Sequence, residues 1–288
     1  MSKPIESYAV IGDLHTVALV SKLGSIDWLC LPHFDDEACF AALLGDESNG
    51  HWTIAPTGKV EAVSRRYRPD TLVLETEISC DSGIIRVTDF MPIRENTDHH
   101  LPEIIRIVEG LEGAVDVSSD LSLRFDYGRS KPFVRKLDEG IHALAGPDGV
   151  VVVSPTEVTL DDHSVRCDLT VRTDERYVFQ IVWHRSWEEI PPASEHLDAL
   201  EETTAFWRKW SEQCTYEGKA RDAVMRSLIT LKSLTYWPSG GVVAAATTSL
   251  PEQIGGERNW DYRYCWLRDS SVTLEALNRC GDLEEAQS

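Results

Sequence analysis

The hydrophobic pattern of this chain changes near residue 190, and that change restricts the fold more than any other sequence feature. Up to about residue 190, short apolar runs alternate with turn residues, a pattern typical of β-strands. Beyond that point, apolar residues recur at helical spacing. The pattern therefore predicts an antiparallel β-sandwich of roughly a dozen strands at residues 1–190, followed by helices.

Three glycine-containing stretches predict tight turns between strands. They are Gly24-Ser25, residues 81–83, and residues 109–113, which separate an apolar run at 103–108 from another at 114–125. Glycine supplies the positive φ that a two-residue hairpin turn requires. We expect a hairpin at each stretch, and a sandwich core that the strands close without help from the helices.

The helical half begins after the Pro191-Pro192 pair. Ser194 is expected to cap a first helix that starts at Glu195, because a serine hydroxyl accepts a hydrogen bond from a free backbone N–H of the first turn. A second helix is expected at about 220–236, and a third from near Leu267 to Arg279. Residues 191–217 are predicted to form a helical linker, and residues 218–288 the start of a second domain.

The acidic charge of the chain excludes some partners. The sequence has 48 Asp and Glu against 28 Lys and Arg, which gives a formal net charge of −20. The negative electrostatic potential of such a chain repels nucleic-acid phosphates and anionic lipids, so neither nucleic acid nor a membrane surface is an expected partner. A neutral sugar meets no electrostatic penalty, and homo-oligomerisation stays an open alternative.

The cysteines indicate the compartment. Seven are scattered along the chain without a Cys-x-x-Cys pair, which argues against a disulfide framework and a zinc site. We therefore expect free thiols, a cytoplasmic location and no metal. The amino terminus resembles no signal peptide, and no apolar run approaches the roughly 18 residues of a membrane span.

The most unusual stretch is residues 255–269, which holds two Trp, two Tyr, three Arg, two Asp, one Glu and one Asn. One interpretation is a sugar-binding pocket, because aromatic rings stack on pyranose faces while Arg and Asp hold paired hydroxyls. The other is a buried ion-pair network that packs a loop between helices. Glu252 and Glu257, the carboxylates nearby, are interpreted as loop or ion-pair residues.

Residues 260–269, Trp-Asp-Tyr-Arg-Tyr-Cys-Trp-Leu-Arg-Asp, resemble the first signature of glycoside hydrolase family 15, which contains glucoamylases, glucodextranases and bacterial trehalases. Residues 8–13, 16–20 and 24–30 resemble the trehalase-like N-terminal domain of bacterial members. Phe34-Asp35 and residues 40–46 extend the likeness, and His33 departs from the family's usual Arg.

The resemblance implies a fold, a reaction and a set of site residues. The fold is a supersandwich-like β-sandwich, a helical linker and an (α/α)6 barrel, of which this chain holds the first helices. The reaction is the inverting hydrolysis of an α-glucoside, either a glucan or maltooligosaccharide or trehalose, without a cofactor. The residues implied to bind substrate are Tyr262, Tyr264, Trp266, Arg268 and Asp269.

The resemblance assigns no catalytic residue within this chain. A barrel of twelve helices needs on the order of 200 residues, and the 71 residues from Gly218 to Ser288 hold two or three helices. The general acid and general base are therefore expected beyond Ser288, and the chain alone is expected to be inactive. The alternative from another functional class is a non-catalytic carbohydrate-binding or scaffold β-sandwich.

Overall fold

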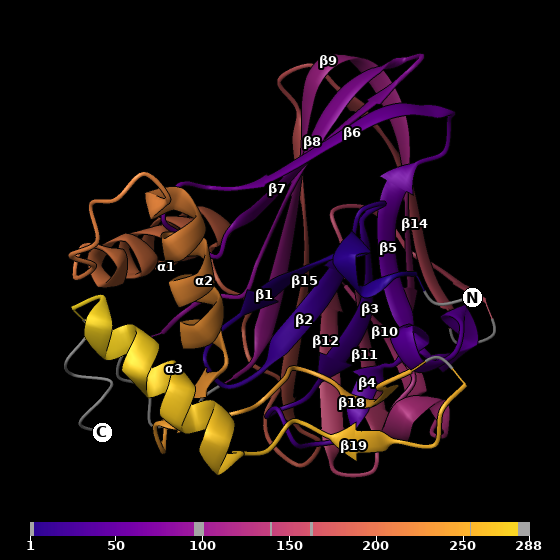
Figure 1. Cartoon of the computed structure of the whole chain (residues 1–288). Coiled ribbons are helices and arrows are strands. Elements are labelled where there is room, and N and C mark those ends of the chain that lie inside the picture. The colour runs from indigo at the N-terminus through magenta and orange to yellow at the C-terminus, as the bar shows by residue number, and fades with distance from the viewer. Residues whose placement is uncertain (1–2, 95–100, 139, 162–163, 254, 282–288) are drawn as a thin grey trace.

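The computed structural model (Figure 1) describes residues 3–94, 101–138, 140–161, 164–253 and 255–281. Antiparallel strands make up the amino-terminal part of this fold, and three α-helices lie to one side of them (Figure 1). The helices are α1 (His196–Ser211), α2 (Arg221–Ser233) and α3 (Leu267–Arg279). Within the described residues, none of these helices has the length and apolarity to cross a membrane.

Fifteen strands of the described residues join into one hydrogen-bonded network, and every pairing between them is antiparallel. Two short strand pairs follow them, β16 with β17 and β18 with β19. The strands are β1 (Tyr8–Gly12), β2 (Val17–Ser21), β3 (Ser25–Cys30), β4 (Ala38–Phe40), β5 (His51–Pro56), β6 (Val60–Tyr67), β7 (Leu74–Cys80), β8 (Gly83–Phe90), β9 (Glu103–Ser122), β10 (Phe133–Leu137), β11 (Gly140–Ala145), β12 (Asp148–Val153), β13 (Thr159–Asp161), β14 (Ser164–Arg172), β15 (Arg176–Arg185), β16 (Thr235–Tyr236), β17 (Gly241–Val242), β18 (Thr248–Pro251) and β19 (Asn259–Asp261).

Strand β9 is the centre of the network. Its first half pairs with β8 and β15, and its second half pairs with β5 and β14. The predicted hairpin at residues 109–113 is therefore wrong, because Glu103–Ser122 is one continuous strand. Gly113 does adopt a positive φ of 73°, but β9 pairs with β8 up to Gly113 across a register shift and continues to Ser122 without reversing. Gly110 serves close packing, since a Cβ there would lie 2.0 Å from the Arg172 carbonyl oxygen.

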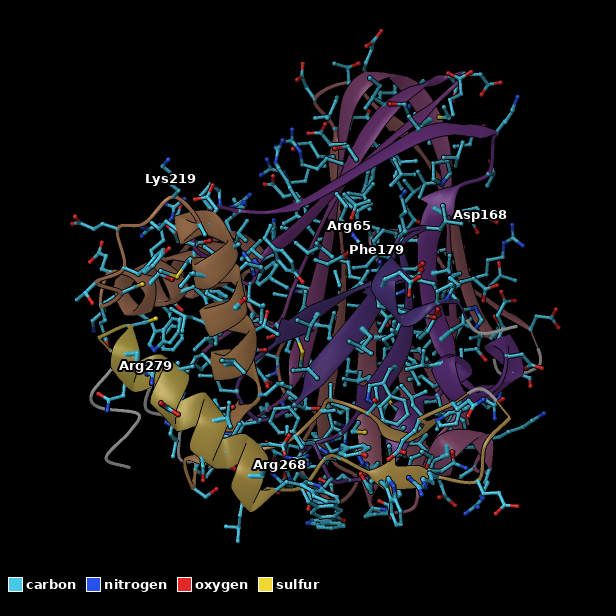
Figure 2. All side chains as sticks on the ribbon, in the orientation of Figure 1. Arg65, Asp168, Phe179, Lys219, Arg268 and Arg279 are labelled. Atoms are coloured by element: carbon cyan, nitrogen blue, oxygen red, sulfur yellow. The ribbon has the colours of Figure 1, made fainter. Side chains whose placement is uncertain are left out.

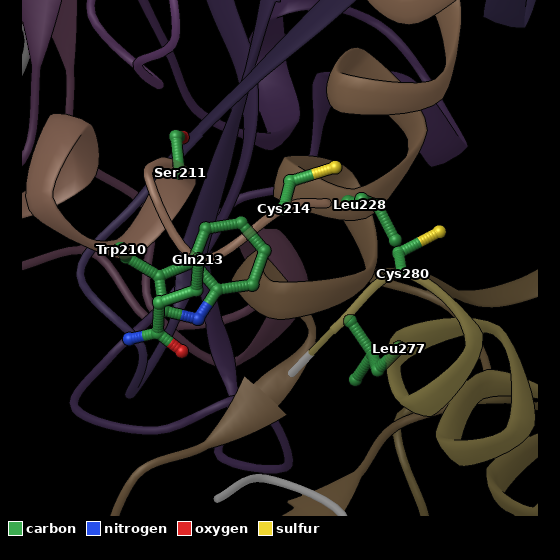
Figure 3. Close-up of a pocket in the computed structure, with 7 residues that line it drawn as sticks. All are labelled: Trp210, Ser211, Gln213, Cys214, Leu228, Leu277 and Cys280. Atoms are coloured by element: carbon green, nitrogen blue, oxygen red, sulfur yellow. The ribbon is translucent and has the colours of Figure 1, made fainter. Parts of the chain in front are cut away.

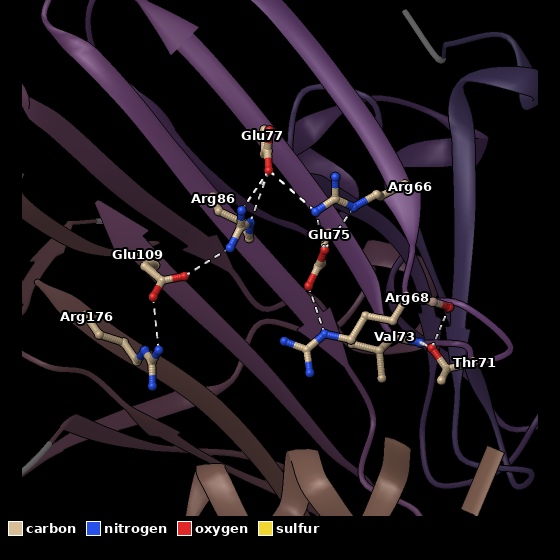
Figure 4. Close-up of polar contacts among 9 residues, drawn as sticks. All are labelled: Arg66, Arg68, Thr71, Val73, Glu75, Glu77, Arg86, Glu109 and Arg176. Atoms are coloured by element: carbon tan, nitrogen blue, oxygen red, sulfur yellow. Dashed lines mark hydrogen bonds and ion pairs between the residues drawn. The ribbon is translucent and has the colours of Figure 1, made fainter. Parts of the chain in front are cut away.

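The other two predicted hairpins are confirmed. Gly24, with a φ of 82°, lies in the turn between β2 and β3, and residues 81–82 connect β7 to β8. Charged side chains follow β7, β8, β9 and β15 at matched positions (Figure 4). Arg86 pairs with Glu77 at 2.8 Å and with Glu109 at 3.3 Å, and Arg176 pairs with Glu109 at 3.0 Å. Alternating charges on neighbouring strands favour this register over one with like charges opposed.

The core has a part closed by strands and a part covered by helices. The largest apolar cluster, which includes Ile54, Leu121 and Ile181, is built from strands and the residues beside them and contains no residue of α1, α2 or α3. Two further clusters depend on helices. Ala199 and Leu200 of α1 cover apolar side chains of β8 and β9, and Trp207 of α1 packs with residues of α2 and with Leu14, Leu72 and Ile93. The expectation that strands close the core unaided therefore holds only for the first cluster.

The helices begin and end close to their predicted positions, with two corrections. Glu195 caps α1, since its carboxylate accepts from the backbone N–H groups of Leu197 and Asp198. Ser194, the predicted cap, instead hydrogen-bonds through its backbone N–H and its hydroxyl to the buried Glu103 carboxylate. The second helix ends at Ser233, because residues 235–236 form β16. The third helix spans Leu267–Arg279 as predicted.

Candidate functional site

The segment that follows β19 lies on the strand region and not apart from it. The backbone N–H groups of Ala245 and Ala244 donate to the carbonyl oxygens of Tyr262 and Tyr264, at 2.8 and 3.1 Å. Trp28 of β3 donates from Nε1 to the Ala246 carbonyl at 2.8 Å. These contacts place residues 262–265 beside residues 243–246, which β3 in turn supports.

Helix α3 begins directly after this segment and presents two charged residues. Trp266 has an extended backbone and precedes the helix, so Arg268 and Asp269 lie in its first turn. Their side chains form an ion pair at 3.0 Å, and 78% of the Arg268 side chain is exposed. The Asp269 carboxylate stabilises the positive end of the helix dipole. Figure 2 shows Arg268 at the start of α3 and Arg279 at its end.

The aromatic residues of the segment form an open surface. The rings of Tyr262 and Trp266 stack with their centroids 5.4 Å apart and their planes at 29°. Tyr264 is 51% exposed, and Trp260 and Trp266 are also exposed. The side chains of Tyr262 and Trp266 therefore contact each other, and so do those of Arg268 and Asp269. For Tyr264, the contact described is a hydrogen bond of its backbone carbonyl. Exposed rings beside donors and acceptors are groups that can hold a sugar.

Arg263 is the buried residue of the segment and Asp261, its half-buried partner, lies two residues before it; the sequence gives neither an individual role. Arg263 is 5% exposed. Its Nη2 donates to Asp261 Oδ2 at 2.8 Å and its Nε to Asp261 Oδ1 at 3.0 Å, while its Nη1 donates to the carbonyl oxygen of Asp36 at 2.6 Å. The guanidinium also lies over the ring of Tyr127, 5.7 Å from its centroid.

The electrostatics of this pair follow from burial and hydrogen bonding. Burial raises the pKa of the Asp261 carboxyl, but hydrogen bonds from the Arg263 side chain and backbone outweigh it and leave the pKa below its ordinary value. Burial lowers the pKa of Arg263, and the hydrogen bond to Asp261 and the neighbouring Cys30 reverse this and raise it. Both groups are therefore charged throughout the physiological range, which suits a permanent structural ion pair.

The two interpretations of residues 255–269 apply to different residues. Arg263 is buried and forms an ion pair with the half-buried Asp261, whereas Tyr264, Trp266 and Arg268 are exposed and Tyr262 and Asp269 are half-buried. Glu252 accepts a hydrogen bond from Trp260 Nε1 at 3.2 Å and pairs with Arg258 at 3.6 Å, which is the geometry of an ion-pair residue. Among the described residues, no three His, Cys, Asp or Glu side chains are grouped to hold a metal ion.

Comparison with known proteins identifies family matches in both halves of the chain. Residues 1–182 match the family described as trehalase-like, N-terminal, and residues 218–288 match glycosyl hydrolases family 15. Over 98% of its length the chain is 37% identical to a trehalase of Thermoplasma volcanium and 33% identical to a trehalase of Mycobacterium tuberculosis. These alignments cover 46% and 45% of the two relatives, so the chain spans about half their length.

A solved structure shares the fold. The crystal structure of a bacterial glucoamylase complexed with acarbose superposes with a TM-score of 0.65 at 14% sequence identity. The match covers all of this chain and 49% of the glucoamylase chain. The arrangement of antiparallel strands with few helices is therefore similar to that of the glucoamylase.

Proposed function

The chain belongs to the trehalase-like N-terminal family, with a match to glycosyl hydrolases family 15 at its carboxyl-terminal end, and we propose that it forms the first half of an inverting hydrolase of trehalose. The observation that carries this proposal is the continuous similarity to six trehalases, each aligned over 94–98% of this chain. Maltooligosaccharides, the other α-glucosides predicted from the sequence, are the alternative substrates.

The surface segment supplies the groups that hold the sugar. Arg268 and Asp269 present adjacent donors and acceptors, which together bind neighbouring hydroxyls of one glucose unit. The Tyr262–Trp266 stack offers an aromatic face for the apolar side of the ring, and Tyr264 extends it. Because Tyr264, Trp266 and Arg268 are exposed, the sugar is enclosed only when the rest of the hydrolase covers this surface.

The domain boundaries follow the same proposal. Residues 1–190 form the β-sandwich, residues 191–217 the helical linker that contains α1, and residues 218–288 the start of an (α/α)6 barrel with α2 and α3. The limits of the two family matches, at residues 182 and 218, support this division. The described cysteines are all free thiols, which supports a cytoplasmic location.

Hydrolysis with inversion needs two carboxyl groups, and those of Asp261 and Asp269 in the segment are paired with Arg263 and Arg268. A general acid protonates the leaving oxygen, and a general base roughly 6.5–9.5 Å away activates water on the other face of the sugar. The Glu252 carboxylate is engaged by Trp260 and Arg258. We propose that both catalytic carboxylates lie outside residues 1–288, and that these residues alone have no turnover.

Glucose release from trehalose and from maltotriose, measured for residues 1–288 and for the full-length hydrolase, tests the function. We expect release from trehalose by the full-length protein and none by residues 1–288. Sugar binding without release by the full-length protein would favour the non-catalytic carbohydrate-binding alternative. Release by residues 1–288 would place catalytic carboxylates in this chain, with Glu252 and Glu257 as the first to test.

Substitution at the start of α3 tests the site residues. In the full-length hydrolase, Arg268→Ala or Asp269→Ala is expected to lower kcat/KM for trehalose. The drop should correspond to a loss of about 2–4 kcal/mol of transition-state stabilisation, the cost of losing a charged hydrogen-bond partner in an enclosed site. The matched control is Cys265→Ala, because Cys265 is exposed and its thiol contacts only the Ser270 hydroxyl among the contacts described. Equal losses for all three variants would contradict the assignment.

A further inference from the structure

We propose that Arg263 is a positioning residue that holds the sugar-binding segment, residues 260–269, on the loop of residues 30–36 and thereby sets the affinity for substrate. The proposal rests on the proposed function of this segment. Arg263 lies between Tyr262 and Tyr264 in the chain, so its position determines where the backbone of both residues runs.

The contacts of Arg263 join two distant parts of the chain through one side chain. Nε and Nη2 hold both carboxylate oxygens of Asp261, and Nη1 donates to the carbonyl oxygens of Asp36 and Phe34 at 2.6 and 3.3 Å. Nη1 also lies 3.4 Å from Cys30 Sγ. Asp36 precedes Arg263 by 227 residues, so the contact fixes the segment to the strand region and not to its own neighbours.

The loop that receives Arg263 is itself held in shape. Asp36 Oδ2 accepts from the backbone N–H of His33 at 3.0 Å and lies 2.8 Å from His33 Nδ1. These bonds close the loop, so the carbonyl oxygens of Phe34 and Asp36 stay aimed at the guanidinium. On the other side, Asp261 Oδ1 accepts from the backbone N–H of Arg263 at 3.0 Å. The hydrogen-bond partners of Arg263 are therefore held in place on both sides of the guanidinium.

The contacts made by the Arg263 side chain require a guanidinium group. A guanidinium carries five N–H donors in a planar fork and can hold a carboxylate on one edge while donating to carbonyl oxygens from another. A lysine ammonium is a single charged point and cannot span both sets of acceptors. Arg263→Lys thus keeps the charge beside Asp261 but releases the loop, which frees the segment to move relative to the strands.

Displacement of binding groups by about 1 Å is enough to weaken a binding site substantially. The full-length hydrolase is tested with Arg263→Lys and Asp261→Asn, and with Arg258→Lys as the matched control. Arg258 is exposed and pairs only with Glu252 among the ion pairs described. We expect KM for trehalose to rise about tenfold in the first two variants with kcat changed less than about threefold, and both constants unchanged in the control.

The separation of KM from kcat distinguishes positioning from stability. A variant that is merely less stable loses active molecules, so kcat falls while KM stays constant, and that result overturns the proposal. Calorimetric trehalose binding by the same proteins gives a readout independent of turnover. A wild type that binds without hydrolysis refutes the proposed function alone, and equal affinities of wild type and Arg263→Lys refute the positioning role. A wild-type protein that neither binds nor hydrolyses trehalose would overturn both the proposed function and the positioning role of Arg263.

Discussion

Two buried histidines, His142 on β11 and His184 on β15, share one hydrogen bond between Nε2 atoms 3.0 Å apart. Arg135 donates from Nε to Nδ1 of His142 at 3.2 Å, so this Nδ1 carries no proton and His142 donates from Nε2. Nε2 of His184 accepts, and its Nδ1 donates to the Arg185 carbonyl at 2.8 Å. Every ring nitrogen has a partner, and both rings are neutral.

Acid is expected to destabilise the protein through this pair. Burial lowers the pKa of both rings, the neighbouring charge of Arg135 adds to this for His142, and the Arg185 carbonyl and Glu188 oppose it for His184. An unfolded histidine titrates near 6.5, so below that pH the unfolded chain binds more protons and the free energy of unfolding falls, by at most about 1.4 kcal/mol per pH unit for each proton.

Urea unfolding between pH 7 and pH 5 measures this effect. We expect His142→Gln to show a shallower loss of stability over that range than the wild type, because one proton-binding difference is removed. Asp261, whose pKa lies below its ordinary value, titrates at lower pH and does not contribute there. Parallel curves for the two proteins would show that the histidine pair does not govern the acid response.

At the residue scale, the sequence predicts which side chains can bind a sugar or form an ion pair, but not which of them are buried. Residues 255–269 allow both a sugar site and an ion-pair network, and both interpretations draw on the same Arg and Asp side chains. Their separation depends on the carbonyl oxygens of Phe34 and Asp36, which Arg263 meets only in the folded chain. Spacing within the segment carries no information about partners so distant.

At the scale of elements, local signals predict helices better than long strands. Helix α3 follows from its own apolar period and matches the prediction at both ends. The glycines of residues 109–113 carry the same local signal as a hairpin turn, but the partners of β9 decide whether the chain reverses. Strands β8 and β15 pair with the first half of β9 and β14 with the second, so the chain continues through residues 109–113 without reversing.

Helix α3 is anchored near its carboxyl-terminal end. Figure 3 shows Leu277 and Cys280 facing the end of α1 and the side of α2, where they line a small pocket with Trp210 and Leu228. Leu277 is 1% exposed, and the Cys280 carbonyl accepts from the Thr215 backbone N–H at 2.8 Å. At the start of the helix, by contrast, Leu267 is 85% exposed.

Truncation of the Leu277 side chain is expected to destabilise α3 without destabilising the strands. Leu277→Ala removes buried apolar volume and is expected to reduce the opening free energy of residues 267–279 by about 2–3 kcal/mol. Amide hydrogen exchange measures this, with β9 as the internal reference and Val272→Ala, at an exposed position of the same helix, as the control. Uniformly faster exchange across β9 and α3 would indicate global destabilisation instead.

At the scale of the whole molecule, the strand region depends on α1. Ala199 and Leu200 cover Val73, Phe90 and Ile105, which lie on strands or beside them and would otherwise meet water. The change of hydrophobic period near residue 190 predicts the order of strands and helices, but it does not show which sheet face a helix covers. That information lies in the packing of side chains from distant segments.

Shortened chains test this dependence. We expect residues 1–217, which retain α1, to unfold cooperatively at a melting temperature higher than that of residues 1–190 by about 5 °C or more, because the shorter chain exposes the face that α1 covers. Thermal denaturation followed by circular dichroism measures the difference. Equal melting temperatures would show that α1 rests on the sheet without stabilising it.

The pairing of strand β9 also determines when the sheet can be completed during translation. Its partners β5 and β8 leave the ribosome before it, while β14 and β15 follow only at Ser164–Arg172 and Arg176–Arg185. At about 5–20 residues per second, β9 waits several seconds with unpaired edges. Such edges can pair with other chains, so the nascent protein is most in need of chaperone protection in the interval before Arg185 emerges.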